Sequence, residues 1–144
     1  MASAERAAAM VRTLSDDPAI LLEVGDDMVA VRGDHLVAVS GVDSDSGGRA
    51  VVLRDGHALA SSSWNALIWS NDDGAAAHHL IDPATGAPAE PASAVVIASD
   101  AGEADALATA LAVRPELVSR LTTCAMVHTA QGERHTAPWE AVAV

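Results

Sequence analysis

The sequence contains no lysine, phenylalanine or tyrosine, and it has a single cysteine among its 144 residues. One cysteine excludes a disulfide framework and a cysteine-based zinc site, so Cys124, which lies in an apolar segment, is expected to be a buried and inert thiol. With no Phe or Tyr and only three Trp, the core has to be built mainly from Ala, Val and Leu.

Positive charge is scarce. All eight basic residues are arginine, against 20 acidic residues, and the formal net charge is −12. Such a surface repels a phosphate backbone, so nucleic acid is not an expected partner. An anionic nucleotide can still bind where a metal ion or helix N-termini supply a local positive field, and a divalent cation would then be required.

Long apolar runs are also missing. No stretch reaches the roughly 18 apolar residues of a membrane span, and the N-terminus has no basic region followed by an apolar segment. We therefore expect a cytoplasmic protein without a membrane segment. Its length suits one domain, residues 1–144.

Apolar spacing and turn residues predict alternating strands and helices. Helices are expected at Ser3–Leu14, 102–112 and 115–121. The strands are expected in four groups: a meander of Ile20–Val24, 28–32 and His35–Val39; a hairpin of 50–53 and 57–61 about Asp55-Gly56; single strands at 79–81 and 93–98; and a closing hairpin within 125–139 about Gln131-Gly132. Residues 43–48 are expected to form a loop.

Asp105 and Thr109 lie four residues apart on the predicted helix, so their oxygen atoms project from one side of it. Hard oxygen ligands in this arrangement can share a Mg²⁺ ion with the phosphate oxygens of a substrate. The alternative is structural: Asp105 interacts with the helix dipole, and Thr109 hydrogen-bonds to its own helix. Spacing alone does not decide between them.

Two neighbouring histidines, His78 and His79, come just before a turn-forming segment. On an extended strand their rings point to opposite faces, so at most one can enter a cleft. A histidine beside an anionic substrate can act as a general base, because its unperturbed pKa lies close to neutral pH. A surface histidine or a hydrogen-bonded core histidine is the alternative.

The turn itself reads DPATG at residues 82–86. Asp82 can accept hydrogen bonds from nearby backbone amides, Pro83 fixes φ, and Gly86 permits a close approach of the backbone. Such a turn can hold a phosphate or can simply reverse the chain. The local sequence supports both interpretations equally.

Two segments of small residues and two of the tryptophans can also either contact a ligand or have a purely structural role. The segments 25–27 and 61–63 supply glycine, hydroxyl and carboxyl groups at strand ends, where the backbone can meet a ligand or merely turn. Trp64 and Trp69 can stack on a nucleotide ring, but in a chain with so few aromatic residues we expect both to pack in the core.

Two longer segments carry a more specific signal. Residues 79–89 read HLIDPATGAPA, and residues 104–110 read ADALATA. They resemble the H-[IL]-I-D-P-x-T-G-x-P-x signature and the A-D-A-L-A-T-A helix of the FAD:protein FMN transferase (ApbE) family. Residues 24–26, VGD, are similar to that family's G-G-D turn with one change, and residues 60–63, ASSS, to its A-T-S-G segment with two. The resemblance extends over nearly the whole chain.

The resemblance implies a T-fold-like α+β domain in which an antiparallel sheet carries packed helices. Family members bind FAD with Mg²⁺ and transfer FMN to a Ser or Thr of a target flavoprotein, and some hydrolyse FAD to FMN and AMP. Phosphoryl chemistry of this kind relies on metal neutralisation and on positioning. Mg²⁺ is thus the implied cofactor and FAD the implied substrate.

The roles of the family's residues carry over onto the matching positions. Asp105 and Thr109 would hold the metal, and His79 would deprotonate the acceptor hydroxyl. The implied cofactor-binding positions border the nucleotide and its diphosphate: Gly25, Asp26, Ser62, Asp82, Thr85 and Gly86.

The resemblance is to the C-terminal portion of the family. Typical members open with an N-terminal half that contributes flavin contacts, a Lys-Gly motif and a further metal ligand, and these have no counterpart in the present sequence. We therefore expect a homodimer or pairing with a complementing chain. The alternative function is a catalytically incomplete module that binds a flavin nucleotide or pairs with a partner.

Overall fold

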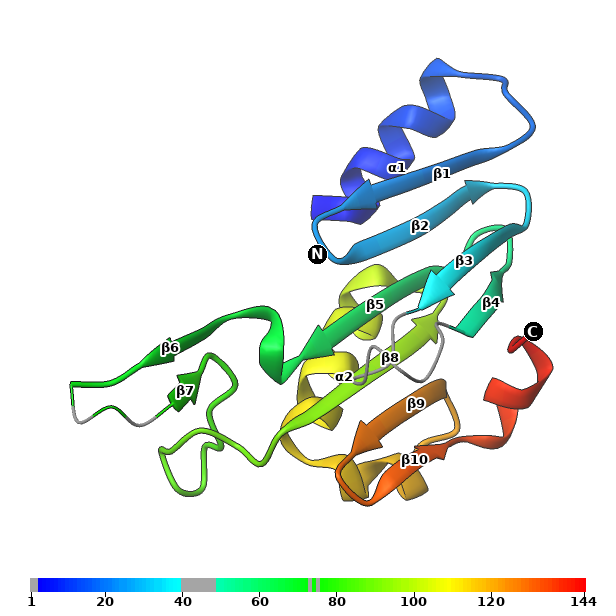
Figure 1. Cartoon of the computed structure of the whole chain (residues 1–144). Helices are drawn as coiled ribbons and strands as arrows, with labels where there is room; N and C mark the ends of the chain where they lie inside the picture. Colours follow the sequence, from blue (N-terminus) through cyan, green and yellow to red (C-terminus); the bar gives the residue numbers. More distant parts are fainter. Residues whose placement is uncertain (1–2, 40–48, 73, 75) are drawn as a thin grey trace.

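The computed structural model describes residues 3–39, 49–72, 74 and 76–144. Within these residues, six strands form an antiparallel sheet in the order β1-β2-β5-β8-β9-β10 (Figure 1). Their bounds are β1 Ile20–Val24, β2 Asp27–Arg32, β5 Ala58–Ser63, β8 Ala92–Ala98, β9 Cys124–Thr129 and β10 Gly132–His135. The predicted antiparallel α+β architecture is confirmed, and the predicted loop at 43–48 lies outside the described residues.

Two helices cover one face of the sheet (Figure 1). Helix α1, Ser3–Leu14, packs on β1 and β2, and helix α2, Ala101–Val113, packs on β5 and β8. Both match the predicted helices to within one residue at each end. Ala104 and Ala108 are buried where α2 meets the sheet, so a core without Phe or Tyr is filled by bringing backbones close together.

The N-terminus of α2 is held by two carboxylates from different parts of the chain. Asp100, the N-cap residue, accepts the amide N–H of Glu103 at 2.7 Å. Glu5 of α1 accepts the amide N–H of Ala101 at 3.0 Å. These bonds satisfy amides that have no partner inside the helix and fix α1 against α2.

The opposite face of the sheet is covered by a two-stranded ribbon, β3 His35–Val39 with β4 Arg49–Leu53 (Figure 1). This pairing corrects two predictions. β1 and β2 do pair, but β3 leaves the expected meander and pairs with β4. The expected hairpin of 50–53 with 57–61 does not form, because β5 pairs instead with β2 and β8.

Burial explains why the hairpin prediction was wrong. Val51 and Leu53 are fully buried against the sheet in a cluster of apolar side chains, so β4 belongs to a different layer from β5. The Asp-Gly turn is present but links the layers: the Gly56 amide donates to the Ala30 carbonyl at 2.8 Å, and the Ala30 amide donates to the His57 carbonyl at 2.9 Å. The Asp-Gly residues favour a hairpin locally, but the burial of β4 in another layer determines which strand it pairs with.

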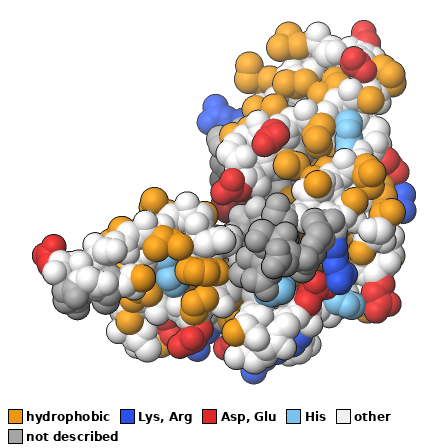
Figure 2. All heavy atoms as spheres, in the orientation of Figure 1, with side chains coloured by type: hydrophobic (Ala, Val, Ile, Leu, Met, Phe, Trp, Pro, Cys, Tyr) orange, Lys and Arg blue, Asp and Glu red, His pale blue; other side chains and the backbone are white. Residues whose placement is uncertain are grey.

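A narrow arm, made of β6 Ile68–Ser70 and β7 Ala76–His78, projects from one end of the sheet (Figure 1). The strand predicted at 79–81 is wrong, since β7 ends at His78. The chain turns there because the His78 ring accepts the amide N–H of Leu80 at 3.3 Å. Figure 2 shows hydrophobic side chains gathered on this arm, where Leu67, Ile68 and Trp69 are exposed.

Short 3₁₀ segments complete the fold: η1 Trp64–Ala66, η2 Pro115–Arg120 and η3 Ala137–Ala141. η2 lies where a helix was predicted at 115–121. The predicted closing hairpin is confirmed by β9 and β10. Among the described residues, no helix has the length and apolar character needed to cross a membrane.

Gly33, between β2 and β3, allows us to separate backbone strain from crowding. Its φ is +73°, and a Cβ built there would lie 2.9 Å from the carbonyl oxygen of Pro18. Gly56 has the same φ of +73° but nothing within 4 Å. We expect Gly33→Ala to lower the free energy of unfolding by about 1–3 kcal/mol and by more than Gly56→Ala does. Urea denaturation of both variants checks this, and equal losses would show that crowding contributes nothing.

Candidate functional site

Asp105 and Thr109 both lie on the solvent-exposed side of α2, opposite the buried Ala104 and Ala108. Their placement on one side of the helix is as the spacing predicted. Within the described part of the chain, the Thr109 hydroxyl makes no hydrogen bond to its own helix. Its oxygen and the Asp105 carboxylate are therefore available to an external ligand.

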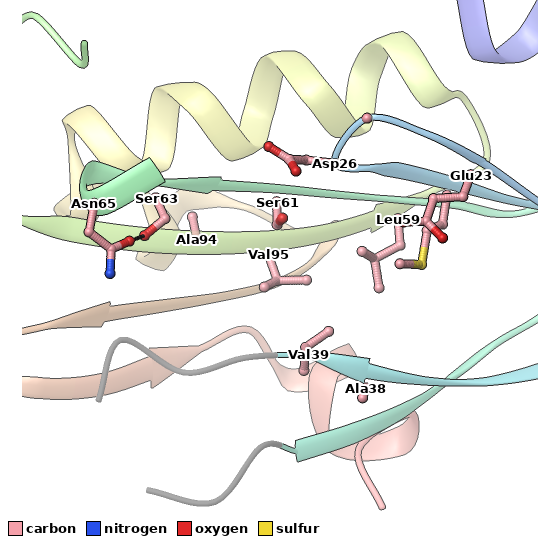
Figure 3. Close-up of a pocket in the computed structure, with 12 residues that line it drawn as sticks. Glu23, Asp26, Ala38, Val39, Leu59, Ser61, Ser63, Asn65, Ala94 and Val95 are labelled. Carbon is pink, nitrogen blue, oxygen red and sulfur yellow. Dashed lines mark hydrogen bonds between the residues drawn. The ribbon is translucent and has the colours of Figure 1, made fainter. Parts of the chain in front are cut away.

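The turn between β1 and β2 brings two more carboxylates toward α2. Gly25 has a φ of +65° and lets the chain reverse, which places Asp26 beside the helix (Figure 3). Burial raises the pKa of Asp27, the first residue of β2, and the nearby Asp105 and Asp26 carboxylates raise it further. The Asp105 region is thus a concentration of negative charge, which repels an anionic ligand unless a cation intervenes.

A cavity of about 290 Å³ lies between this turn, β5, β8 and β3 (Figure 3). Gly25 and Asp26 line it, as do residues that sequence reasoning did not select. Those residues offer carboxyl, hydroxyl and amide groups: Glu23, Ser61, Ser63 and Asn65. Ser63 hydrogen-bonds to Asn65 and to Ser93, which fixes the rim at one end of the cavity.

Ser62 does not face this cavity. Side chains alternate along a strand, and its neighbours Ser61 and Ser63 line the cavity. Ser62 therefore lies on the same face of β5 as Ala60, which packs with the α2 core. The assignment of Ser62 to the nucleotide stays a prediction, and it concerns the helix face rather than the cavity.

The Asp82–Gly86 turn lies at the C-terminal end of α2. The Asp82 carbonyl accepts the amides of Thr85 at 3.2 Å and Gly86 at 2.8 Å. The Asp82 carboxylate accepts the Ala84 amide at 2.9 Å and the Arg114 guanidinium at 2.8 Å. Because Arg114 is the C-cap of α2, this ion pair ties the turn to the helix that carries Asp105 and Thr109.

Arg114 was not singled out from the sequence. Its one available signal was its position, since a basic residue is common where a helix ends and can interact with groups near the helix terminus. The sequence does not show which carboxylate it meets. The partner, Asp82, is 32 residues away in the chain.

His79 is exposed, and its Nδ1 lies 3.5 Å from the Leu67 carbonyl oxygen. His78 is buried, which agrees with the prediction that the two rings point to opposite faces. The cavity lining does not include His79, Asp82, Thr85, Gly86, Asp105 or Thr109. The structure places Asp26 beside α2 (Figure 3) and Asp27 near Asp105, and it places the 82–86 turn at the C-terminal end of the same helix.

Cys124, Trp64 and Trp69 do not line the cavity. Burial raises the pKa of the Cys124 thiol to about 11, so this half-buried thiol stays protonated and inert at neutral pH. Trp64 packs against the α2 core, as predicted. The core prediction for Trp69 is wrong, since it is 43% exposed on an arm of only two strands.

A Mg²⁺ ion fits the donors at α2. Among the described residues, no group of three or more His, Cys, Asp or Glu side chains could hold a metal ion by itself. Mg²⁺ commonly takes one or two protein oxygens and completes its octahedron with waters and substrate phosphates. Asp105 and Thr109 offer such oxygens, and the surrounding carboxylates favour a cation.

The structure is an antiparallel α+β fold that carries hard oxygen donors on one helix, beside a glycine turn and a cavity. The model of the ApbE family matches residues 2–126, and the chain therefore belongs to the ApbE family. The comparison with curated proteins finds no match.

A solved structure shows the same fold. The crystal structure of the ApbE protein from Thermotoga maritima MSB8 is similar with a TM-score of 0.80 and 24% sequence identity. The similarity covers 96% of this chain and 49% of the Thermotoga chain. The chain thus spans about half the length of that protein.

The Asp82–Arg114 pair predicts a pH-dependent turn. The Ala84 amide and then Arg114 hold the pKa of Asp82 below its ordinary value. Ionised Asp82 therefore stabilises the folded turn above the pKa of the unfolded chain, and this contribution is lost as the pH falls through the folded-state pKa. In Arg114→Met the loss should begin at a higher pH, because the Ala84 amide alone remains.

The measurement is an NMR titration of the Ala84 and Gly86 amides. Arg120→Met, which removes an exposed arginine at the end of η2, is the matched control and should titrate like the wild type. An unchanged midpoint in Arg114→Met would show that the ion pair does not hold the turn.

Proposed function

We propose that this protein binds FAD through its diphosphate with Mg²⁺ and transfers FMN to a Ser or Thr of a target flavoprotein, or to water. The observation that carries the proposal is the side of α2 on which Asp105 and Thr109 are exposed. Asp26 lies beside that helix (Figure 3), and Arg114 ties the DPATG turn to its C-terminal end. Membership of the ApbE family supports the same chemistry.

In this proposal each residue acts on a stated part of FAD. Asp105 and Thr109 would hold Mg²⁺, which when bound neutralises charge on the diphosphate. Thr85 and Gly86 line the diphosphate, and Gly86, which has no side chain and open space where a Cβ would lie, lets an oxygen atom approach the backbone. Gly25, Asp26 and Ser62 border the rest of the nucleotide, and Asp82 orients the turn.

The transfer forms one bond and breaks one. The acceptor oxygen attacks the phosphorus of the FMN half, the bond to the bridging oxygen breaks, and AMP leaves with that oxygen. His79 accepts the proton of the acceptor hydroxyl; its exposed ring suits a reaction with a large protein substrate. With water as the acceptor, the products are free FMN and AMP.

The charge of the chain makes the cation essential to the proposal. The net charge is −12, and Asp26, Asp27 and Asp105 add local repulsion toward a diphosphate. Interactions among charges this close are only partly screened by salt. FAD binding should therefore depend on Mg²⁺.

The test is to incubate the protein with FAD and Mg²⁺ and to measure AMP by chromatography, with an EDTA-treated sample as control. We expect AMP to appear only with Mg²⁺, and free FMN to match it when water is the acceptor. When a flavoprotein acceptor is present, free FMN should fall short of AMP by the amount bound to protein. Absence of AMP in every sample contradicts the enzymatic proposal.

A second candidate function is a flavin-nucleotide-binding or partner-pairing module without turnover. It is favoured by the exposed Leu67, Ile68 and Trp69 on the arm. It predicts that flavin fluorescence reports binding while no AMP is released. Light scattering should then show a homodimer or, with a complementing chain, a heterodimer.

A further inference from the structure

We propose that His78 is a positioning residue that closes the base of the 79–89 loop and so sets where His79 and the DPATG turn lie. The inference rests on the proposed function, in which His79 and that turn act on FAD. His78 itself touches none of the proposed substrate groups, and sequence reasoning assigned it no role.

The His78 ring bonds to both ends of the loop. Its Nδ1 lies 3.3 Å from the amide nitrogen of Leu80, and its Nε2 lies 2.9 Å from the carbonyl oxygen of Ala89. Leu80 is the second residue of the loop, and Ala89 is its last. One side chain therefore joins the two strands of the loop at their base.

The tip of the loop is held by the bonds within the Asp82–Gly86 turn and by Arg114, whereas two backbone hydrogen bonds join its two sides nearer the base. The Ala89 amide donates to the Leu80 carbonyl, and the Asp82 amide donates to the Ala87 carbonyl, each at 2.9 Å. Between them Ile81 bridges to Pro88, which has no amide N–H to give. With so short a ladder, the bonded His78 ring fixes the base of the loop, while Arg114 holds its tip.

The two contacts define the protonation state of His78. The Leu80 amide is a donor, so Nδ1 must accept and carries no proton. The Ala89 carbonyl is an acceptor, so Nε2 must carry the proton and donate it. With these two bonds the His78 ring is a neutral imidazole with both nitrogens engaged, whereas the neighbouring His79 is exposed to solvent.

Packing holds His78 and Leu80 on either side of His79. His78 is 6% exposed, and its ring meets Trp64 edge-on with centroids 6.0 Å apart at 70°. Leu80 is buried in the cluster that contains Ala104 and Ala108 of α2. Because both neighbours are fixed, the backbone of His79 has a set position relative to α2.

The first experiment needs no substrate. Long-range ¹H–¹⁵N NMR of the wild type at neutral pH should show His78 neutral with the proton on Nε2. A charged ring, or a proton on Nδ1, overturns the proposal. Because it uses the wild-type protein, this measurement tests the proposal even if a His78 variant does not fold.

The second experiment compares two substitutions by hydrogen exchange. His78→Leu keeps bulk but removes both bonds, whereas His78→Gln can still accept from Leu80 and donate to Ala89. We expect the Leu80 amide to exchange about tenfold faster in His78→Leu and within about twofold of the wild type in His78→Gln. Unchanged exchange in His78→Leu, or equal damage in both variants, overturns the proposal.

The hydrogen exchange of the Leu80 amide and the tautomer of His78 are both measured without FAD. Failure of the positioning proposal can therefore be distinguished from failure of the proposed function. If the wild type releases AMP, kcat should fall in His78→Leu and recover in His78→Gln, while the KM for FAD changes less than kcat. A fall in both variants would show that bulk and ring shape, not the two hydrogen bonds, position the loop. Absence of AMP from the wild type would contradict the enzymatic proposal and leave the exchange result to stand.

Discussion

Asp105→Ala should reduce Mg²⁺-dependent AMP release from FAD by at least about a hundredfold, the upper end of what loss of an outer-shell metal partner alone costs. The reason is direct: Asp105 supplies the one carboxylate in the proposed ligand pair, and Thr109 is a neutral donor. The measurement is the steady-state rate of AMP formation at saturating FAD and Mg²⁺.

Glu103→Ala provides the matched control. Glu103 is an exposed acidic residue on the same helix, two positions earlier, and the cap that it receives from Asp100 uses its backbone amide. Removing its side chain changes the net charge by the same amount without touching the proposed ligands. Equal loss of rate in the two variants would show that helix charge, and not ligation by Asp105, is responsible.

Although Asp105→Ala should slow AMP release, it should raise the free energy of unfolding. Asp105 raises the pKa of Asp27, so the two carboxylates repel one another when both are ionised. In Asp105→Ala the pKa of Asp27 should fall toward its ordinary value, while burial, the larger cause, keeps it somewhat raised. Alanine is also the better helix former, by up to about 0.7 kcal/mol. Lower stability in Asp105→Ala would indicate a structural residue rather than a ligand.

Trp139→Ala should lower the free energy of unfolding by about 3–5 kcal/mol. Trp139 is 1% exposed and packs in the cluster that joins the β3–β4 ribbon to the sheet, with Val51 and Leu53. The residues that follow it reinforce the ribbon, since the Val52 amide donates to the Val142 carbonyl at 2.8 Å. In a domain stabilised by about 5–15 kcal/mol, the expected loss is a large fraction of the total.

Trp69→Ala is the control for that measurement. Trp69 is exposed on the arm, so its removal should change the free energy of unfolding by no more than about 0.5 kcal/mol. Urea denaturation followed by circular dichroism measures both variants. A loss of less than about 1 kcal/mol in Trp139→Ala would mean that the ribbon does not depend on this side chain.

Features encoded within a few residues could be predicted from the sequence. The apolar period of α2 and the proline and glycine of the 82–86 turn gave correct elements, and the four-residue spacing placed Asp105 and Thr109 on one side of a helix. These depend on local backbone preferences and on helix geometry, which neighbouring residues largely determine.

Features that depend on distant contacts could not be predicted. The Asp-Gly turn at 55–56 indicated a hairpin, but the burial of Val51 and Leu53 placed β4 in another layer. Strand alternation puts Ser62 on the opposite side of β5 from Ser61 and Ser63, but which side meets α2 follows from the packing of β5 against that helix. The roles of Arg114 and His78 likewise depend on partners that only the folded chain brings together.

The most direct test of the proposal is calorimetric titration of FAD into the protein with Mg²⁺ and with EDTA. The exposed Asp105 and Thr109 oxygens, set among carboxylates, predict that FAD binds with Mg²⁺ and at least about tenfold more weakly without it. Equal affinity in the two buffers, or no binding in either, would contradict a metal-dependent diphosphate site on α2.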